Sequence, residues 1–305
     1  MSINIFPMKY VVTGATGNTG APLVSALLQA GHEVVAIGRH ADKLAALEGA
    51  QIAVGDLADA AFLTQAFDGA DAVYAMIPPR FDAPDFRAYQ NEVATAITQA
   101  LKVTGVRHVV TLSSFGAHRP DTGVVGGLYD FEQLLARELP DAHVLHLRAA
   151  FFLENLFGMI PTVQQAGVLG GMPLPADLPM ALVHTADIAA VAARRLLARD
   201  FEGHSHVAVA AAGWFSMAQI ATVLGAAIDR PDLVYVQFPA ADFKGAMMGM
   251  GASESLADAY LAFGAAAAAG ALSEGTEPGA APTPTGLHEF APVWAGAFRQ
   301  TAVAH

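Results

Sequence analysis

The chain has 305 residues, of which 54% are hydrophobic and only 14% charged, so it is long and apolar enough to bury a sizeable core. Its formal net charge of −12 argues against direct nucleic-acid binding, because affinity for a phosphate backbone depends on clustered Lys and Arg side chains. With no cysteine and no metal-ligand spacing among its eleven histidines, the chain predicts no disulfide, no metal site and no cysteine nucleophile.

Membrane insertion and secretion are not indicated either. No apolar run reaches the ~18 residues that a membrane-spanning helix needs. The first residues lack a basic segment followed by a long apolar stretch, so they do not resemble a secretory signal. The sequence therefore predicts a cytoplasmic protein.

Short apolar runs alternate with amphipathic segments over the first 150 residues. The apolar runs lack polar alternation, which is typical of a parallel sheet covered by helices on both faces. We expect strands at 9–13, 33–38, 51–54, 72–76, 108–112 and 143–147, and helices near 19–30, 41–48, 59–67, 86–104 and 129–138. These residues predict an α/β fold, a Rossmann-type doubly wound parallel sheet.

The alternation of predicted strands and helices changes after residue 148. Helices are expected at 187–199 and 216–228, short strands at 206–210 and 233–237, and a nearly all-helical tail at 240–270 and 286–299, with a Pro/Gly/Thr loop at 273–286. Asp187 is expected to cap the first of these helices, with Thr185 as the alternative. We therefore predict a dinucleotide-binding domain over 1–150 and a smaller α+β subdomain for substrate or partner over 151–305, interleaved with the first.

Residues 13–20 read TGATGNTG and lie between the first predicted strand and the first predicted helix. Gly14 permits a tight turn, Gly17 lets the backbone approach a pyrophosphate, and Gly20 allows the helix to pack closely on the strand. The helix N-terminus then presents unpaired amides to the phosphates. This context favours a dinucleotide site over an ordinary glycine-rich turn. The expected contacts are Gly14, Thr16, Gly17, Asn18, Thr19 and Gly20.

The end of the second predicted strand selects the cofactor. An acidic residue there typically binds the ribose 2′-hydroxyl of NAD, whereas arginine suits the 2′-phosphate of NADP. Arg39 follows this strand, with Lys43 four residues later and no carboxylate at the tip. Two solvated cations are the alternative, but in a chain with only four lysines the pair favours NADP(H) over NAD(H). After the third strand, Asp56 and Leu57 are expected near the adenine, and Asp56 alternatively caps the next helix.

Segments spread over nearly the whole chain resemble the NmrA-like branch of the atypical short-chain dehydrogenases/reductases. They are TGATGNTG at 13–20, GRHADK at 38–43, GDLAD at 55–59, AMIPP at 75–79, GVRHVVTLSS at 105–114, HLRAAFFLENL at 146–156, VHTADIAAVAA at 183–193 and TPTGLHEFA at 283–291. The resemblance implies the fold and the cofactor. The family contains NAD(P)H-dependent reductases of quinones, dyes and other small acceptors, and also regulators that bind the dinucleotide without turnover.

The larger superfamily uses a Tyr-x-x-x-Lys pair on a helix and a serine at the end of the preceding strand. Ser114 fills the serine position and Tyr129 is the nearby tyrosine, so these are the candidate catalytic residues. No lysine occurs between residues 103 and 243, and an alternative register places Val124 and Leu128 at the two pair positions. A tyrosine without its lysine is a poor acid–base catalyst. The sequence therefore disfavours ketone–alcohol chemistry and favours acceptors whose reduced anion is delocalised.

An apolar substrate pocket is expected at the carboxyl ends of the strands. Ile77 and Pro78 follow the fourth strand, so they should face the nicotinamide of the cofactor. The expected pocket residues are Phe115, His118, Phe152 and Asn155. The alternatives are core packing for the aromatic residues, a structural role for the histidine and a capping amide for the asparagine.

These observations predict an NAD(P)H-dependent oxidoreductase that transfers a hydride to a small apolar acceptor such as a quinone or a conjugated carbonyl. The alternative is a non-catalytic NADP(H)-binding sensor of redox state that acts through a regulatory protein partner. A homodimer is compatible with either function.

Overall fold

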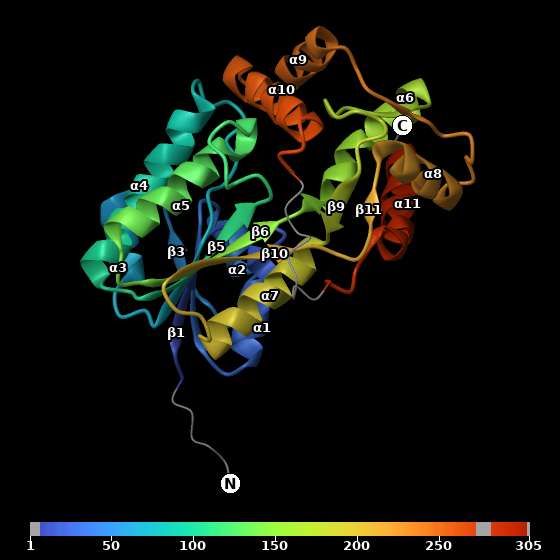
Figure 1. The fold of residues 1–305 in the computed structure, drawn as a ribbon. Helices are drawn as coiled ribbons and strands as arrows, with labels where there is room; N and C mark the ends of the chain where they lie inside the picture. Colours follow the sequence, from blue (N-terminus) through green and yellow to red (C-terminus); the bar gives the residue numbers. More distant parts are fainter. Residues whose placement is uncertain (1–6, 273–281, 304–305) are drawn as a thin grey trace.

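The computed structural model describes residues 7–272 and 282–303, so most of the loop expected at 273–286 lies outside the described residues. Figure 1 shows a parallel sheet flanked by helices and a smaller lobe beside it. In chain order the elements are β1 (Lys9–Val12), α1 (Gly20–Gln29), β2 (Glu33–Gly38), α2 (Ala41–Ala45), β3 (Gln51–Val54), α3 (Ala60–Phe67), β4 (Ala72–Ala75), α4 (Phe86–Thr104), β5 (His108–Ser114), the 3-10 helix η1 (Gly123–Val125), α5 (Gly126–Glu138), β6 (His143–Ala149), β7 (Phe151–Phe152), the 3-10 helix η2 (Leu153–Met159), α6 (Ile160–Ala166), β8 (Leu169–Gly170), β9 (Met180–Val183), α7 (Thr185–Ala198), β10 (His204–Val209), β11 (Trp214–Phe215), α8 (Met217–Ala227), β12 (Tyr235–Val236), α9 (Ala240–Gly249), α10 (Glu254–Ala268) and α11 (Leu287–Val303).

The main sheet has seven parallel strands in the order β10-β6-β5-β4-β1-β2-β3. The chain moves outward in one direction from β1 to β3 and in the other from β4 to β10, so the order reverses between β1 and β4. In such sheets ligands bind outside the carboxyl ends of the strands at this reversal. The Rossmann-type fold predicted from the sequence is confirmed.

Apolar side chains on both faces of the sheet explain why its strands read as continuous hydrophobic runs. One face packs against α3, α4 and α5, with Leu63, Val93 and Leu135 in its core. The other face packs against α1 and α7, with Leu23 and Ile188 in its core. Figure 1 shows these two helical layers on opposite sides of the strands.

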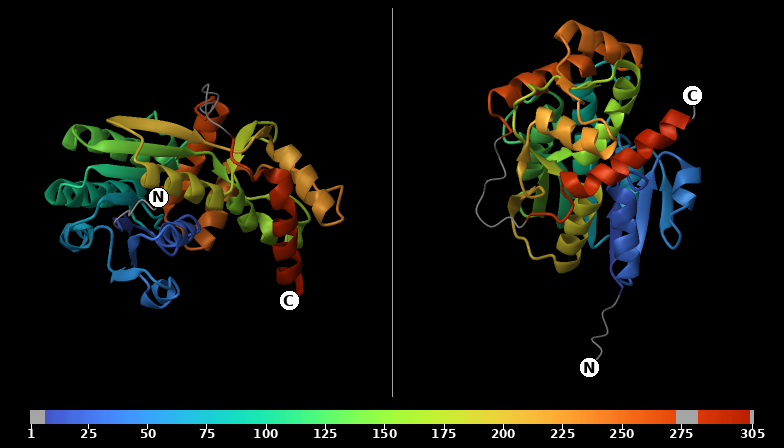
Figure 2. Two further views of the ribbon diagram at one scale, coloured as in Figure 1. Left: turned by 90° about the horizontal axis from the view of Figure 1, so that it is seen from below. Right: turned by 90° about the vertical axis from the view of Figure 1, so that its right-hand side faces the viewer.

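The C-terminal lobe consists of β7, β8, β9, β11 and β12 with η2, α6, α8 and α11. A three-stranded sheet, β11-β9-β7, and the pair β12-β8 lie in it. Its apolar core includes Trp294, which is fully buried and donates its indole N–H to the carbonyl of Leu156 at 2.8 Å. Both views of Figure 2 show α11 running along one side of this lobe toward the C-terminus.

A cap formed by α9 and α10 packs over the start of α4. Phe86, the first residue of α4, lies in one apolar cluster with Phe243 and Leu256. The amide of Phe86 donates to the Ser255 hydroxyl at 3.0 Å, and the amide of Ser253 donates to the carbonyl of Phe81 at 2.8 Å. These bonds join the cap to α4 and to the loop before it across about 170 residues of sequence.

The later part of the chain departs from the predicted pattern at several points. The strand expected at 206–210 joins the main sheet as β10, and the helical run expected at 240–270 is broken into α9 and α10. His184, rather than Asp187 or Thr185, caps α7 by accepting from the amide of Ala186 at 3.2 Å. The Asp187 carboxylate instead accepts from the amide and hydroxyl of Thr285, a residue far away in the sequence. Across the described ranges, no helix is long and apolar enough to span a membrane, and no group of three or more metal-ligating side chains is found.

Candidate cofactor and acceptor site

The loop between β1 and α1 is shaped by two of its glycines. Gly14 has a φ of 61°, in the left-handed region that side chains disfavour. Gly20 begins α1 so close to the strand end that an added Cβ would lie 2.2 Å from the carbonyl oxygen of Gly14. Only glycine therefore allows the helix to start here.

The same loop carries backbone amides that make no hydrogen bond within the described part of the protein. Gly17 donates to the carbonyl of Gly14 at 3.0 Å, which closes the turn. Among the residues that the structure describes, the amides of Thr16, Asn18 and Thr19 reach no protein acceptor. Together with the N-terminus of α1 they form a nest of donors suited to an anion. The loop therefore fits the pyrophosphate of a dinucleotide.

Two cations mark the corner beyond the end of β2. Arg39 and Lys43 are both exposed. Burial raises the pKa of Tyr89. The positive charges of Arg39 and Arg80 act in the opposite direction, so both guanidinium groups lie close enough to the Tyr89 ring to affect it electrostatically. The guanidinium carbon of Arg80 lies 5.6 Å from the centroid of that ring. Arg80, which no sequence motif marks, thus adds a second arginine to this corner.

The turn after β3 is held by local hydrogen bonds. Asp56 accepts from the amide of Ala58 at 3.0 Å, whereas Asp59 caps α3 by accepting from two amides of its first turn. Asp56 is therefore not the cap of α3, and its exposed carboxylate stands beside the buried Leu57.

A cavity of about 350 Å³ lies at the carboxyl ends of β4, β5 and β6, within the size range of small-molecule sites. Its lining is largely apolar and comes from the main sheet, η1, α4, the C-terminal lobe and α10. The side chains in the lining that carry oxygen or nitrogen are Gln90, Ser113, Ser114, Asn155 and Tyr260.

Met76 joins this cavity to the glycine loop. It follows β4, and its amide donates to the hydroxyl of Thr13 at 2.9 Å. Its sulfur would lie 2.6 Å from a Cβ added to Gly14, and its side chain also lines the cavity. The phosphate-type loop and the apolar cavity are therefore adjacent parts of one site.

A buried ionic network lies behind the cavity. The Ser113 hydroxyl donates to the Glu132 carboxylate at 2.5 Å, and Arg148 donates to both oxygens of that carboxylate at 2.7 and 3.2 Å. Glu132 and Arg148 are 5% and 8% exposed. The Ser114 hydroxyl contacts the carbonyl of Phe115 at 3.0 Å. The Ser113 proton is thus directed into the protein, and this serine can only accept a hydrogen bond from a ligand.

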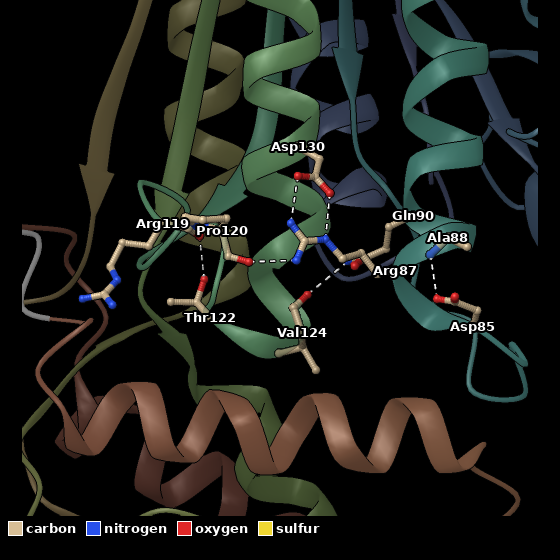
Figure 3. A network of polar contacts seen from close by, with 9 residues as sticks. All are labelled: Asp85, Arg87, Ala88, Gln90, Arg119, Pro120, Thr122, Val124 and Asp130. Carbon is tan, nitrogen blue, oxygen red and sulfur yellow. Dashed lines mark hydrogen bonds and ion pairs between the residues drawn. The ribbon is translucent and has the colours of Figure 1, made fainter.

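The segment that includes η1 is anchored by α4. Arg87 donates to both carboxylate oxygens of Asp130 at 2.8 and 2.9 Å, and the amide nitrogen of Gln90 donates to the carbonyl of Val124 at 3.1 Å (Figure 3). Val124 and Leu128 both line the cavity. The two residues that the alternative register assigns to the Tyr–Lys positions therefore line the cavity.

Most of the residues expected at the acceptor site lie in the cavity lining, whereas two do not. The lining includes Ile77, Pro78, Ser114, Phe115, Phe152 and Asn155. Tyr129 is outside it, because it follows Leu128 and lies about 100° further around α5. His118 is exposed and also outside the lining. The phenol that lines the cavity is Tyr260 on α10, and no local sequence signal distinguishes it from a core aromatic residue.

A family model described as the NmrA-like family matches residues 8–291. The chain belongs to the NmrA-like family. It is 33% identical over 253 residues to the NAD(P)H azoreductase of Xenophilus azovorans, in an alignment that covers 82% of this chain and 84% of the relative. The family membership predicted from the sequence motifs is thereby confirmed.

Two solved structures of reductases share the fold of this NmrA-like protein. An NADPH-dependent quinone oxidoreductase of Escherichia coli, solved with NADPH, has a TM-score of 0.75 at 24% identity and covers 92% of this chain and 98% of its own. The triphenylmethane reductase of Citrobacter sp., solved with NADP(H), has a TM-score of 0.77 at 19% identity, covering 94% and 99%. At these identities the likeness establishes the architecture.

Proposed function

We propose that this NmrA-like protein is an NADP(H)-dependent reductase of small apolar acceptors, such as quinones, azo compounds or conjugated carbonyls. The observation that carries the proposal is the adjacency of an open amide nest and an apolar cavity, joined by Met76. The azoreductase and quinone oxidoreductase relatives support the same reaction class.

The chain offers a separate group for each part of the cofactor. The nest after β1 suits the pyrophosphate, and Arg39 suits a 2′-phosphate through its planar pair of donors. Arg80 adds charge in the same corner. Ile77 and Pro78, at the carboxyl end of β4, would pack on the nicotinamide, which supplies a hydride when the cofactor is bound. On this proposal the residues from 151 onward complete the acceptor side of the site.

The cavity wall favours acceptors that need little acid catalysis. Val124 and Leu128 replace the superfamily's Tyr–Lys pair by apolar surface, which positions a flat acceptor and excludes water. Reduction of a quinone or azo group places negative charge in a delocalised system. A saturated ketone instead develops a localised alkoxide and depends on the missing pair.

Turnover by the purified protein tests this proposal. NADPH oxidation would be followed by absorbance with 1,4-naphthoquinone, a neutral azo dye and, as the matched poor acceptor, cyclohexanone. We expect turnover of the first two, a much lower kcat/KM for cyclohexanone, and a higher kcat/KM with NADPH than with NADH. Tight NADPH binding without turnover of any acceptor would contradict the reductase assignment and favour a sensor.

A further inference from the structure

The polar groups in the cavity differ in whether they have a proton to give. The Ser113 proton points to Glu132, and Gln90 donates its amide N–H to Val124 while its side-chain oxygen is sealed from solvent without a partner. The Ser114 hydroxyl donates to the carbonyl of Phe115, and Asn155 is an amide on an exposed residue, so neither offers an acidic proton to a ligand. Tyr260 lines the cavity, forms no hydrogen bond through its hydroxyl within the described ranges, and is not among the sealed polar atoms. Its phenol is therefore the acidic group available to a ligand.

We propose that Tyr260, presented by α10, donates a hydrogen bond to the acceptor oxygen or nitrogen on which negative charge develops during reduction. This inference rests on the proposed reductase function. It assigns to the cap of α9 and α10 the hydrogen bond that the superfamily's tyrosine gives, at a position where the alternative register has Val124 in η1. Tyr260 thereby becomes a catalytic residue that touches the acceptor.

Backbone contacts on both sides hold α10 in place. A Cβ on Gly123, in η1, would lie 2.0 Å from the carbonyl oxygen of Ala259, and a Cβ on Gly264 would lie 2.0 Å from the carbonyl oxygen of Pro173. Such close approach of η1, α10 and the segment before β9 requires glycine at both positions. Tyr260 lies between these two contacts along the helix, so the backbone that bears its ring is held in place. Preorganised donors of this kind are the ones that stabilise developing charge.

Along α10, the residues that face inward recur at helical spacing. Leu256 packs in the apolar cluster with Phe86, while Tyr260 and Phe263 line the cavity one turn later. The Tyr260 ring meets Phe243 of α9 edge-on, with centroids 6.4 Å apart. The apolar surroundings fix the ring and leave the hydroxyl as its reactive atom.

The proton balance matches the chemistry of delocalised acceptors. The acceptor gains a hydride, its charged oxygen or nitrogen accepts a hydrogen bond from the phenol, and water supplies the proton. Burial raises the pKa of Tyr260, so the phenol stays protonated at neutral pH and serves as a donor, not as a base.

Two acceptors distinguish a direct contact of the Tyr260 hydroxyl with the acceptor from a purely structural role of that hydroxyl. Reduction of 1,4-naphthoquinone needs a hydride and a proton, whereas reduction of N-methylacridinium, a cation, needs the hydride alone. We expect Tyr260→Phe to lower kcat/KM for naphthoquinone by about 100-fold, as does the loss of one hydrogen-bond donor to developing charge, and to change it less than ~2-fold for acridinium.

Equal losses for both acceptors would show that the hydroxyl acts on structure or hydride geometry, and no loss for naphthoquinone would show that it does nothing. Either outcome overturns the inference. Because the substitution removes a hydroxyl without a protein partner, the variant should fold and bind NADPH as the wild type does.

A binding measurement tests Tyr260 without turnover. By calorimetry, with and without NADP+, the wild-type protein should bind 1-tetralone more tightly than tetralin, which lacks the carbonyl. Tyr260→Phe should reduce the ratio of the two dissociation constants by about 3- to 10-fold, the equivalent of one neutral hydrogen bond. An unchanged ratio would contradict the contact. If the protein reduces no acceptor, the reductase proposal fails, while this ratio still reports whether Tyr260 donates into the cavity.

Discussion

Replacement of Gly123 by alanine should displace α10 and with it the acceptor side of the cavity. Gly123 has a φ of 56°, and an added Cβ would lie 2.0 Å from the carbonyl oxygen of Ala259 and 2.5 Å from the amide nitrogen of Phe263. Both are backbone atoms of α10, so no side-chain rotation relieves the clash. The helix must move by ~1 Å or more to reach an ordinary contact distance.

Two costs add in this variant. A left-handed φ costs an alanine ~1–2 kcal/mol relative to glycine, and overpacking of a fixed contact costs roughly 1–3 kcal/mol. We therefore expect Gly123→Ala to lower the free energy of unfolding by about 2–5 kcal/mol. Gly105 provides the matched control, because it has a φ of 70° at the end of α4 and no atom within 4 Å of an added Cβ. Gly105→Ala should cost only ~1–2 kcal/mol.

Urea unfolding of the two variants measures this difference, and steady-state kinetics measure its effect on the site. Gly123→Ala should raise KM for the acceptor while leaving the dissociation constant of NADPH unchanged, since the added Cβ meets backbone atoms of α10 and not the glycine loop. Gly105→Ala should leave both constants unchanged. Equal destabilisation by the two substitutions would refute the reasoning, because it would mean that α10 does not press on η1.

Three further outcomes follow from the structure. Arg39→Ala should weaken NADPH binding by about 10- to 100-fold and NADH binding by less than ~3-fold, as titration by fluorescence would show; equal losses would remove Arg39 from the 2′-phosphate site. Gly20→Ala should abolish binding of both dinucleotides, because its Cβ would lie 2.2 Å from the Gly14 carbonyl oxygen; retained calorimetric binding would contradict this. Burial lowers the pKa of His146 to about 4, so between pH 6.5 and 4 the unfolded chain binds a proton that the folded one does not, and stability falls as pH falls. From pH 7.5 to 5 the free energy of unfolding, measured with urea, should fall by about 2 kcal/mol from this cause. The His146→Leu variant should lose less over the same range, and an identical pH dependence of the two proteins would exclude His146 as the cause.

The part of the fold that depends on local periodicity was predictable. The strands at 33–38 and 51–54 and the helix at 86–104 agree with the structure to the residue. Apolar runs of this kind and a long amphipathic segment indicate strand and helix with little ambiguity. The two-residue strands β7, β8 and β11 carry no such signal, because two residues do not define a period.

Long-range pairing was not predictable from the same patterns. Nothing in residues 204–209 indicates that they pair with β6 in the main sheet, since strand order depends on the whole chain. The cap of α7 was misassigned for a related reason. Asp187 stands where a capping carboxylate is expected, but its partner Thr285 is 98 residues away, and the unexpected His184 caps the helix.

The cofactor side of the site was more predictable than the acceptor side because its geometry is local. The glycine spacing that brings α1 against β1 lies within eight residues, and each glycine has a steric reason that can be stated from sequence. The acceptor side is assembled from segments as distant as Ser113 and Tyr260. A shift of one residue along α5 decides whether Tyr129 or Leu128 faces the cavity, and sequence periodicity does not resolve one residue.

Different parts of the chain provide the cofactor side and the acceptor side of the site. In the superfamily pattern one helix carries both members of the Tyr–Lys pair, so a change on that helix affects the proton donor and its lysine together. Here η1 presents Val124 and α5 presents Leu128, the loop after β1 provides the phosphate nest, and our proposed donor stands on α10. The cap contacts η1 and the start of α4 but contributes no residue to the nest. Stabilisation of the reduced acceptor and cofactor binding are therefore separable in this chain, and substitutions on α9 and α10 should change which acceptors are reduced without changing the preference between NADPH and NADH.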